Sequence, residues 1–405
     1  MFLIRQSQPK DVPTLLKLAR MVYFINLPPN EAIIATKIEQ AKRAFIKAGG
    51  GKVDEPKQRG KKRPGGSGLA AMDHHSDLFM FTMEDTETGE VIGTSQIRAH
   101  QGGPGNPNWA MQISTRTFKS DPLSFSSAHQ VGKLFGDETG PSEIGGLIIQ
   151  PSYRGHAARP GRLLSFIRFH FIGLHRNLFA ERILAEMMAP VTSDGDNAFW
   201  DHFGRKFIPV KYAEADRFCQ HNRTFIPELL PREEIYLSLF PLEVQNQVGQ
   251  VSADTVPARK LLESMGFRYR GFIDPFDGGP HLDAATGDVP LVRSTCSLPL
   301  GEPADDVSLA AGDGDQTHGQ SIISLLRGDG EFRAVEAPAA VVGGVLLTTP
   351  EACDALGARK GDRVGFTPID WQPGALEPAA PERTARPARS SRLPAKKKTR
   401  SKAGR

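Results

Sequence analysis

The 405-residue sequence has few cysteines and no long apolar run. Cys219, Cys296 and Cys353 stand far apart without Cys-x-x-Cys spacing, so neither a disulfide framework nor a zinc site is predicted. No apolar run reaches the about 20 residues that a membrane helix needs. The first ten residues also lack the apolar core of a signal peptide. We therefore expect no membrane segment, no bound metal and a reducing, cytoplasmic setting.

Acidic residues are absent from the last part of the chain. Residues 383–405 carry ten Lys or Arg and no Asp or Glu, so the formal net charge of +4 hides a charge of −6 on the rest of the chain. Pro, Ala and Ser fill the remainder, and we predict a disordered basic tail over 371–405. The tail could touch nucleic acid, but it lacks interleaved aromatic residues, so a solvated tail is favoured. Residues 49–68, rich in Lys, Pro and Gly, predict a disordered insertion.

The most informative stretch is a short apolar run followed by a helical pattern. Residues 144–149 have the length of a buried strand, which Pro151 ends. Gly145 and Gly146 inside it suggest a bulge or a close backbone approach by another group. Pro160 suits the first position of a helix, and apolar residues then recur at helical spacing.

The loop between this strand and helix contains Arg154, Gly155, Arg159, Gly161 and Arg162. A helix N-terminus offers unpaired N–H groups and partial positive charge, and three nearby arginines make an anion site that suits a diphosphate. The P-loop and the Gly-x-Gly-x-x-Gly fingerprint are both missing. The alternative is a surface turn between a core strand and a core helix.

Further elements are expected along the chain. Strands are predicted at 2–5, at 78–83 with 91–97 as a hairpin, at 109–118 and at 182–188. One helix is predicted to follow Asp11, which is its expected cap, and a second helix is predicted at 31–48. Residues 120–139 show little periodicity and are expected to be a loop bordering the site. Residues 332–366 read as a short β-rich segment.

A pattern of a short amphipathic helix, a glycine and an aromatic residue occurs twice, at 196–207 and 257–267. It predicts two similar units in tandem. The expected domains are 1–212, which contains the anion loop, 213–300 as a second unit, and a small β-rich segment at 301–370 before the tail.

The strand, loop and helix resemble the Arg-x-x-Gly-x-Gly/Ala loop of the GNAT acyltransferases. Ordered motifs over about 140 residues resemble, more narrowly, the arginine N-succinyltransferase family. They are Gly161-Arg162-Leu163-Leu164-Ser165, Ala185-Glu186-Met187, Phe199-Trp200 with Gly204, Ala213-Glu214-Ala215-Asp216, Phe225-Ile226-Pro227-Glu228-Leu229, Val248-Gly249-Gln250-Val251, Gly266-Phe267-Arg268-Tyr269 and Asp274-Pro275-Phe276-Asp277-Gly278-Gly279-Pro280. The resemblance implies an α/β (α+β) fold with two tandem GNAT-like units, mixed sheets and flanking helices, in which the first domain, 1–212, binds the acyl-CoA.

The resemblance also implies an activity, the transfer of a succinyl group from succinyl-CoA to the α-amine of arginine or ornithine in arginine catabolism. The strand backbone at Gly145, Gly146, Leu147 and Ile148 is then the platform for the thioester, and Arg154, Gly155, Gly161 and Arg162 hold the diphosphate. Arg159 or Arg223 could pair with the free carboxylate of the acyl group. Glu186, Asp274 and Asp277 are candidates for the guanidinium group of arginine; turn or cap roles are the alternative for both aspartates.

The sequence departs from the family at three places. The phosphate loop is longer and has fewer glycines, and the central strand has Gly145-Gly146 where larger residues are usual. Glu233 stands where the family has its catalytic histidine, so Glu233 is the candidate base, with Glu143 as second choice. Two alternatives stay open: an N-acyltransferase with another amine or acyl donor, and a non-catalytic acyl-CoA-binding member that docks through its tail. A homo- or hetero-oligomer is possible.

Overall fold

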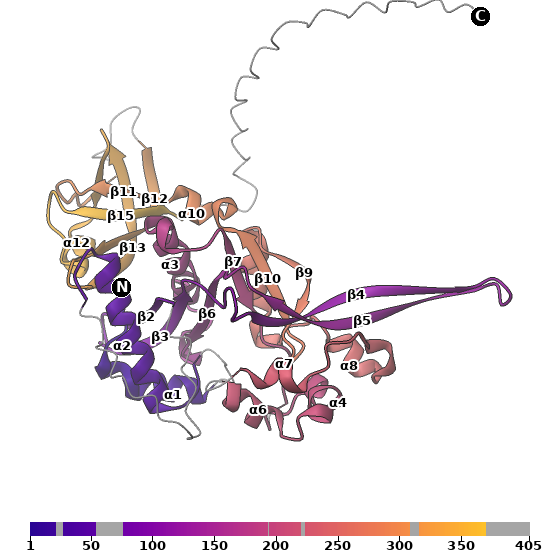
Figure 1. Ribbon diagram of the computed structural model, residues 1–405. Helices are drawn as coiled ribbons and strands as arrows, with labels where there is room; N and C mark the ends of the chain where they lie inside the picture. The colour runs from indigo at the N-terminus through magenta and orange to yellow at the C-terminus, as the bar shows by residue number, and fades with distance from the viewer. Residues whose placement is uncertain (22–26, 54–75, 193, 220–222, 308–315, 370–405) are drawn as a thin grey trace, which may run out of the picture. The chain divides into compact units, whose positions relative to one another are not determined.

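A computed structural model describes residues 1–21, 27–53, 76–192, 194–219, 223–307 and 316–369 (Figure 1). The predicted tail and residues 54–68 of the predicted insertion lie outside this part. The strands are β1 Phe2–Gln6, β2 Leu78–Asp85, β3 Val91–Arg98, β4 Asn108–Ser120, β5 Phe125–Asp137, β6 Ser142–Ile149, β7 Arg182–Glu186, β8 Ile235–Tyr236, β9 Arg268–Ile273, β10 Pro280–Ala285, β11 Cys296–Pro299, β12 Gln316–Leu326, β13 Phe332–Val342, β14 Val345–Thr348 and β15 Arg363–Pro368. The helices are α1 Val12–Arg20, α2 Glu31–Ala48, α3 Pro160–Leu174, α4 Ala198–His202, α5 Gly204–Phe207, α6 Tyr212–Cys219, α7 Phe225–Leu229, α8 Leu242–Gln247, α9 Val256–Ser264, α10 Pro290–Ser294 and α12 Pro350–Leu356.

All described strands belong to one mixed sheet, in the order β11-β15-β12-β13-β1-β2-β3-β6-β7-β10-β9-β4-β5-β8, with β14 paired to β13. Among these strands only β6 and β7 pair in parallel. The predicted mixed α/β class is therefore confirmed. The stretches 1–212, 213–300 and 301–370 all contribute strands, and Met1–Trp371 form one compact unit. Neither predicted boundary separates one sheet from another, and the tandem units stay a prediction.

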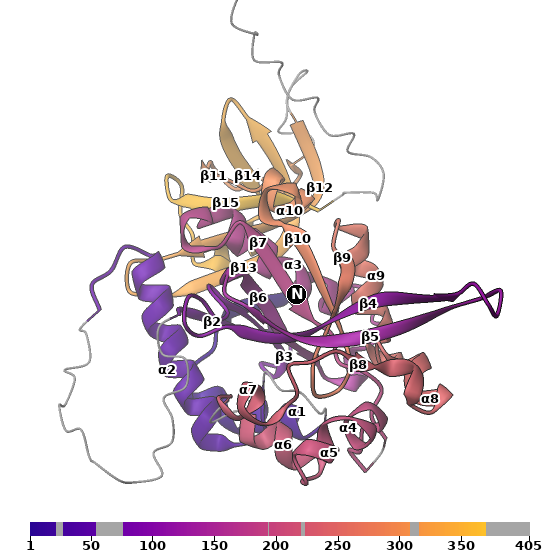
Figure 2. The ribbon, with the colours of Figure 1, turned by 45° about the vertical axis from the view of Figure 1, so that its right-hand side comes forward.

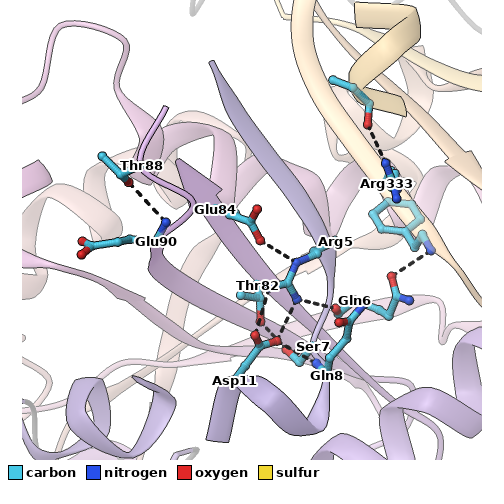
Figure 3. Close-up of polar contacts among 12 residues, drawn as sticks. Arg5, Gln6, Ser7, Gln8, Asp11, Thr82, Glu84, Thr88, Glu90 and Arg333 are labelled. Carbon is cyan, nitrogen blue, oxygen red and sulfur yellow. Dashed lines mark hydrogen bonds and ion pairs between the residues drawn. The ribbon is translucent and has the colours of Figure 1, made fainter. Parts of the chain in front are cut away.

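The N-terminal strand is fixed by a buried ion-pair network (Figure 3). Arg5 donates to both carboxylate oxygens of Asp11, at 2.8 and 2.9 Å, and to Glu84 on β2 at 3.0 Å. Asp11 also accepts the backbone N–H of Gln8 at 2.8 Å. Asp11 is the N-cap residue of α1, as predicted, but its side chain makes no capping hydrogen bond to this helix, because Arg5 and Gln8 occupy its oxygens.

The centre of the main core is aromatic. Phe45 on α2, Phe79 and Phe81 on β2, Phe171 on α3 and Phe332 on β13 pack together, with ring centroids 4.7–5.6 Å apart. All five side chains are fully buried. Burial of an aromatic side chain stabilises the fold by about 1.5–3 kcal/mol. This cluster holds α3, which follows the predicted anion loop, against the sheet.

Strands β4 and β5 form a long hairpin whose distal part extends away from the other strands (Figures 1 and 2). The strand predicted at 109–118 is confirmed. The prediction of a loop over 120–139 was wrong, because residues 125–137 form the return strand. Most side chains at the distal end are exposed on both faces, so the sequence shows no alternation there.

The two copies of the predicted repeat differ in structure. At 257–267 the prediction is confirmed: α9 ends before Gly266, with φ of +97°, and β9 follows. At 196–207 it was wrong, because Gly204 begins the further helix α5 and α6 follows it. A Cβ on Gly204 would lie 2.2 Å from the Trp200 ring. This glycine therefore permits close packing between helices.

Candidate active site

Strands β6 and β7 separate soon after they begin. They pair only at Ser142 with Ile183 and at Glu143 with Leu184, whereas β6 continues to Ile149. Beyond Glu143 the edge of β6 that faces β7 therefore makes no β-ladder hydrogen bonds with β7. Gly145 lies two residues after Glu143, and Glu186 lies two residues after Leu184. This separation leaves backbone groups of β6 open to a ligand.

The glycine pair in β6 forms a bulge. Ile148 pairs with Thr94 and Gly145 with Gln96, so β6 has one residue more than β3 between these pairs. Gly146 has φ of +56°, and a Cβ there would lie 3.0 Å from the Gln96 side chain. The predicted bulge is confirmed. The extra residue of a bulge stays outside the ladder, which redirects its N–H group.

The loop after β6 leads directly into the N-terminus of α3. Gly155 has φ of +76°, and Arg159 lies in the left-handed region with φ of +48°. Pro160 is the first residue of α3, as predicted. The left-handed turn at Arg159 reverses the chain, and no side chain caps the helix. Pro160 has no N–H group, and the N–H groups of Arg162 and Leu163 donate to Arg159 O at 2.9 and 3.3 Å, so the N–H group of Gly161 is what the first turn offers a ligand or water.

The three loop arginines have different surroundings. The exposed Arg154 lies 3.6 Å from Asp254, which precedes α9. Arg162 pairs with Glu336 on β13 at 3.1 Å, and its Nε is a buried donor without a hydrogen-bond partner. Arg159 makes no ion pair in the described part of the chain. Arg159 and Arg162 line a cavity of about 570 Å³ together with His156, Leu163, Gln320 and Glu336, among others.

A row of polar side chains crosses one face of the sheet beside the separation. Glu143 on β6 aligns with Leu184 on β7, and Glu186 lies two residues further on the same face. His281 on β10 pairs directly with Glu186, and its Nε2 is 3.8 Å from Glu186 Oε1. Asn108, the first residue of β4, donates to Glu186 Oε1 at 2.8 Å. Asp274 follows β9 on the same side.

Glu186 and Asp274 also line a cavity of about 20 Å³, with Asn108, Asp216 and Arg223 among the other lining residues. Burial, followed by the charge of Asp274, raises the pKa of Asp216 to about 7. Burial and the charges of Asp277 and Glu186 raise the pKa of Asp274. Asp216 Oδ1 is buried without a partner. The pocket therefore holds more negative than positive groups, because the carboxylates of Glu186, Asp216 and Asp274 face one guanidinium, that of Arg223.

Two side chains that can act as bases, His281 and Lys37, lie in or beside this group of carboxylates. His281 is 6% exposed and its Nε2 has no hydrogen-bond partner. Burial lowers the pKa of His281, although Asp274 and Glu143 oppose the shift. Lys37 on α2 is also buried, and burial with the charge of Arg98 lowers its pKa to about 7, against Glu143. Removal of the Arg223 guanidinium from water lowers its pKa, but Glu186 and other negative groups outweigh this and raise it.

The predicted catalytic and substrate-binding residues fall into two groups, those that lie at the pocket or the polar row and those that lie elsewhere or have another role. Glu186, Arg223 and Asp274 meet in the pocket, and Glu143 lies in the same polar row. Asp277 is apart in role, because its oxygens accept the N–H groups of Ala189 and Gly279 at 3.0 and 2.7 Å. Glu233 is exposed in the segment between α7 and β8 and lines neither cavity.

Sequence reasoning missed Lys37, Asn108, Asp216 and His281. Asp216 lies in one of the motifs that carry the family resemblance, and His281 directly follows another, which ends at Pro280. Those motifs were the available signal. No such signal marked Asn108, which begins a long hairpin, or Lys37, which lies in an ordinary amphipathic helix.

One atom each from Glu186, Asp274 and His281 lies within 4.8 Å of the other two. Such a group could accept one cation, either a metal ion or a positively charged group of a substrate.

In the described part of the chain, no helix is long and apolar enough to cross a membrane.

A family model described as arginine N-succinyltransferase beta subunit matches residues 65–291. The chain is 32% identical to an arginine N-succinyltransferase of Escherichia coli (strain 55989 / EAEC) over 369 residues, which are 90% of this chain and 96% of the relative. It is 30% identical to one from Yersinia pestis (strain Pestoides F) over 367 residues, 90% and 97% of the two chains.

The fold is similar to the solved structure of arginine/ornithine succinyltransferase subunit AI from Pseudomonas aeruginosa. The TM-score is 0.71 at 24% identity, covering 92% of this chain and 99% of that one. Fold and sequence together define an acyltransferase. The chain belongs to the arginine N-succinyltransferase family.

Proposed function

We propose that this enzyme transfers the succinyl group of succinyl-CoA to the α-amine of arginine, with ornithine as the second candidate. One observation carries the proposal. Glu186 stands at the end of β7, where β7 has parted from β6, and also lines the acidic pocket. A backbone edge suited to a thioester thus adjoins carboxylates suited to a cationic amino acid.

The acyl donor lies along β6 in this proposal. The backbone of Gly145, Gly146, Leu147 and Ile148 faces the thioester, and an N–H group redirected by the bulge stabilises the oxyanion. The N–H group of Gly161 at the start of α3, with Gly155, Arg154 and Arg162, holds the diphosphate. Arg162 would exchange Glu336 for this ligand, because a diphosphate carries more charge than one carboxylate.

The amino acid occupies the acidic pocket. The carboxylates of Glu186, Asp216 and Asp274 bind its positive charge, and Arg223 pairs with a carboxylate of the amino acid or of the succinyl group. A cavity of about 20 Å³ accommodates a group of about the size of one water molecule. The rest of the substrate therefore requires the pocket to widen.

The test is a turnover screen of succinyl-CoA and acetyl-CoA against a panel of amino acids that includes arginine, ornithine and lysine. Release of free coenzyme A, with mass spectrometry of the product, identifies the donor and the amine. The proposal expects succinylated arginine or ornithine. Turnover with other pairs only would assign another N-acyltransferase, and binding of acyl-CoA without turnover would assign a non-catalytic member.

We place the reaction in the cytoplasm, which suits a chain whose Cys219, Cys296 and Cys353 are all free. An assembly of more than one chain and a solvated basic tail, favoured over contact with nucleic acid, stay predictions.

A further inference from the structure

We propose that Glu186, Asp274 and His281 form a tripod that holds the α-ammonium group of the amino acid, and that His281 accepts its proton. The inference deepens the proposed function, on which it rests, because it assigns the reacting nitrogen to three named acceptors. Glu186 comes from β7, His281 from the neighbouring β10 and Asp274 from the turn after β9.

The spacing of the acceptors matches an ammonium group. Its three N–H bonds point at tetrahedral angles, so acceptors at hydrogen-bond distance from the nitrogen lie about 4.7 Å apart. Here one atom of each residue lies within 4.8 Å of the other two, and His281 Nε2 lies 3.8 Å from Glu186 Oε1, so the three acceptors surround one ammonium group once they open by up to about 1 Å. A guanidinium is planar and larger, and the adjoining cavity of about 20 Å³ has room for little more than one ammonium.

The state of His281 is a second, independent observation. Its Nε2 lies 3.8 Å from Glu186 Oε1, is buried, and has no hydrogen-bond partner. An unpaired buried polar atom costs free energy, so a donor at this place is favourable. Of the three acceptors, only a neutral imidazole offers a lone pair without a formal charge. The proton can therefore move to His281 while both carboxylates keep their charges.

The neighbours of the tripod fix its geometry. Asn108 donates to Glu186 Oε1 at 2.8 Å, and the N–H group of Phe276 donates to Asp274 Oδ1 at 2.7 Å. Both acids are thereby oriented before substrate arrives. The charged groups that act on His281 come from the surrounding elements: Glu186 and Arg182 on β7, Glu143 on β6, Asp137 on β5 and Asp274 after β9. Negative groups predominate, which favours the imidazolium once the proton has moved.

The nitrogen of the amino acid loses two protons during the reaction. One proton passes from the ammonium nitrogen to His281 Nε2 and then to solvent. The free amine attacks the thioester carbonyl, a C–N bond forms, and the C–S bond breaks. The second proton of the nitrogen goes to the leaving thiolate, which gives an amide and free coenzyme A.

The test compares His281→Gln, which keeps an acceptor but cannot take a proton, with His281→Leu, which removes both functions. His129→Gln, on the distal hairpin, is the control. We expect His281→Gln to keep KM within about threefold and to lose about 10²–10⁴ in kcat near neutral pH. Its kcat/KM should rise tenfold per pH unit as the substrate amine loses its own proton. His281→Leu should also raise KM. Melting temperature and coenzyme A affinity serve as checks on folding.

Binding of arginine and of 5-guanidinopentanoate, which lacks the α-amine, locates the contact. His281→Leu should weaken the binding of arginine and leave the binding of 5-guanidinopentanoate unchanged. Equal weakening of both ligands, or turnover by His281→Gln at the parent rate, would overturn the tripod. Titration of Mn²⁺ or Zn²⁺ alone provides the third arm: tight binding that His281→Leu abolishes, with turnover dependent on the metal, would make the cluster a metal site instead. If the parent enzyme acylates another amine, the proposed function is wrong, and the same His281 variants are then measured with that amine. The two ideas can therefore fail independently of each other.

Discussion

Asn108 and Glu186 meet at 2.8 Å, the first residue of β4 donating to the last residue of β7. This contact links the base of the long hairpin to the acidic pocket. Asn108→Ala should weaken arginine binding by about 10- to 100-fold, because a hydrogen bond to a charged group contributes about 1.5–3 kcal/mol. Calorimetric titration measures the change. Asn106→Ala, an exposed neighbour, should bind arginine as the parent does, and coenzyme A affinity should stay constant in both.

The bulge in β6 gives a second prediction. Gly146→Ala places a Cβ 3.0 Å from Gln96 at a φ of +56°, so it should lower the free energy of unfolding by about 1–2 kcal/mol. Turnover should fall further than stability explains, because the backbone N–H groups of the bulge shift. Gly287→Ala meets no atom within 4 Å and is the matched control. Chemical denaturation and steady-state rates are the measurements. An intact turnover number in Gly146→Ala would remove the bulge from the reaction.

The sequence predicted the parts of the site that are local in the chain. The run of residues 144–149, Gly145 and Gly146, and Pro160 specify a strand, a bulge and a helix start by short-range rules, and all three are confirmed. The pairing of β1 with β13 joins Leu3 to Val335, and no local pattern encodes a contact at such a separation.

His281 shows the same limit at the site. A single histidine in a strand gives no pattern, and its importance arises only when β10 pairs with β7. β5 escaped detection for another reason: its exposed outer half has no buried face to impose alternation. Asp11 has a residue type suited to a helix cap, but Arg5 competes for its carboxylate.

The phosphate loop yields a third prediction. Arg154→Ala and Arg162→Ala should each weaken acyl-CoA binding by about 10- to 100-fold, because each removes a charge-assisted contact worth about 1.5–3 kcal/mol. Arg176→Ala, an arginine at the other end of α3, is the control. Fluorescence titration with coenzyme A measures the effect, and unchanged affinity in both loop variants would move the diphosphate elsewhere.

The raised pKa of Asp216 predicts a pH dependence. The folded-state pKa of about 7 lies above the unfolded value, so the stability that this group contributes is complete below about pH 4 and is lost as pH rises through 7. Asp216→Asn stays neutral throughout. The melting temperature of Asp216→Asn relative to the parent should therefore increase between pH 5 and pH 8.

Arginine binding should respond in the opposite direction, because ionised carboxylates attract its positive charge. The affinity of the parent should rise between pH 6 and pH 8, by at most about tenfold per unit for each proton released. In Asp216→Asn the slope should be smaller. Equal slopes in the two proteins would place the titrating group outside this pocket.

The last prediction separates two candidate bases. Glu233 occupies the sequence position of the family's histidine, yet it is exposed beside Glu234, which pairs with Arg116 on the hairpin. His281 is buried at the carboxylates. An exposed carboxylate keeps strong contact with water and is a weak base near neutral pH, whereas an imidazole is suited to take a proton there. We therefore expect Glu233→Gln to turn over within about threefold of the parent and His281→Gln to lose about 10²–10⁴ in kcat. The reverse ranking in steady-state assays, with the acidic limb of the pH–rate profile lost in Glu233→Gln, would assign the base to Glu233 as the sequence alone suggests.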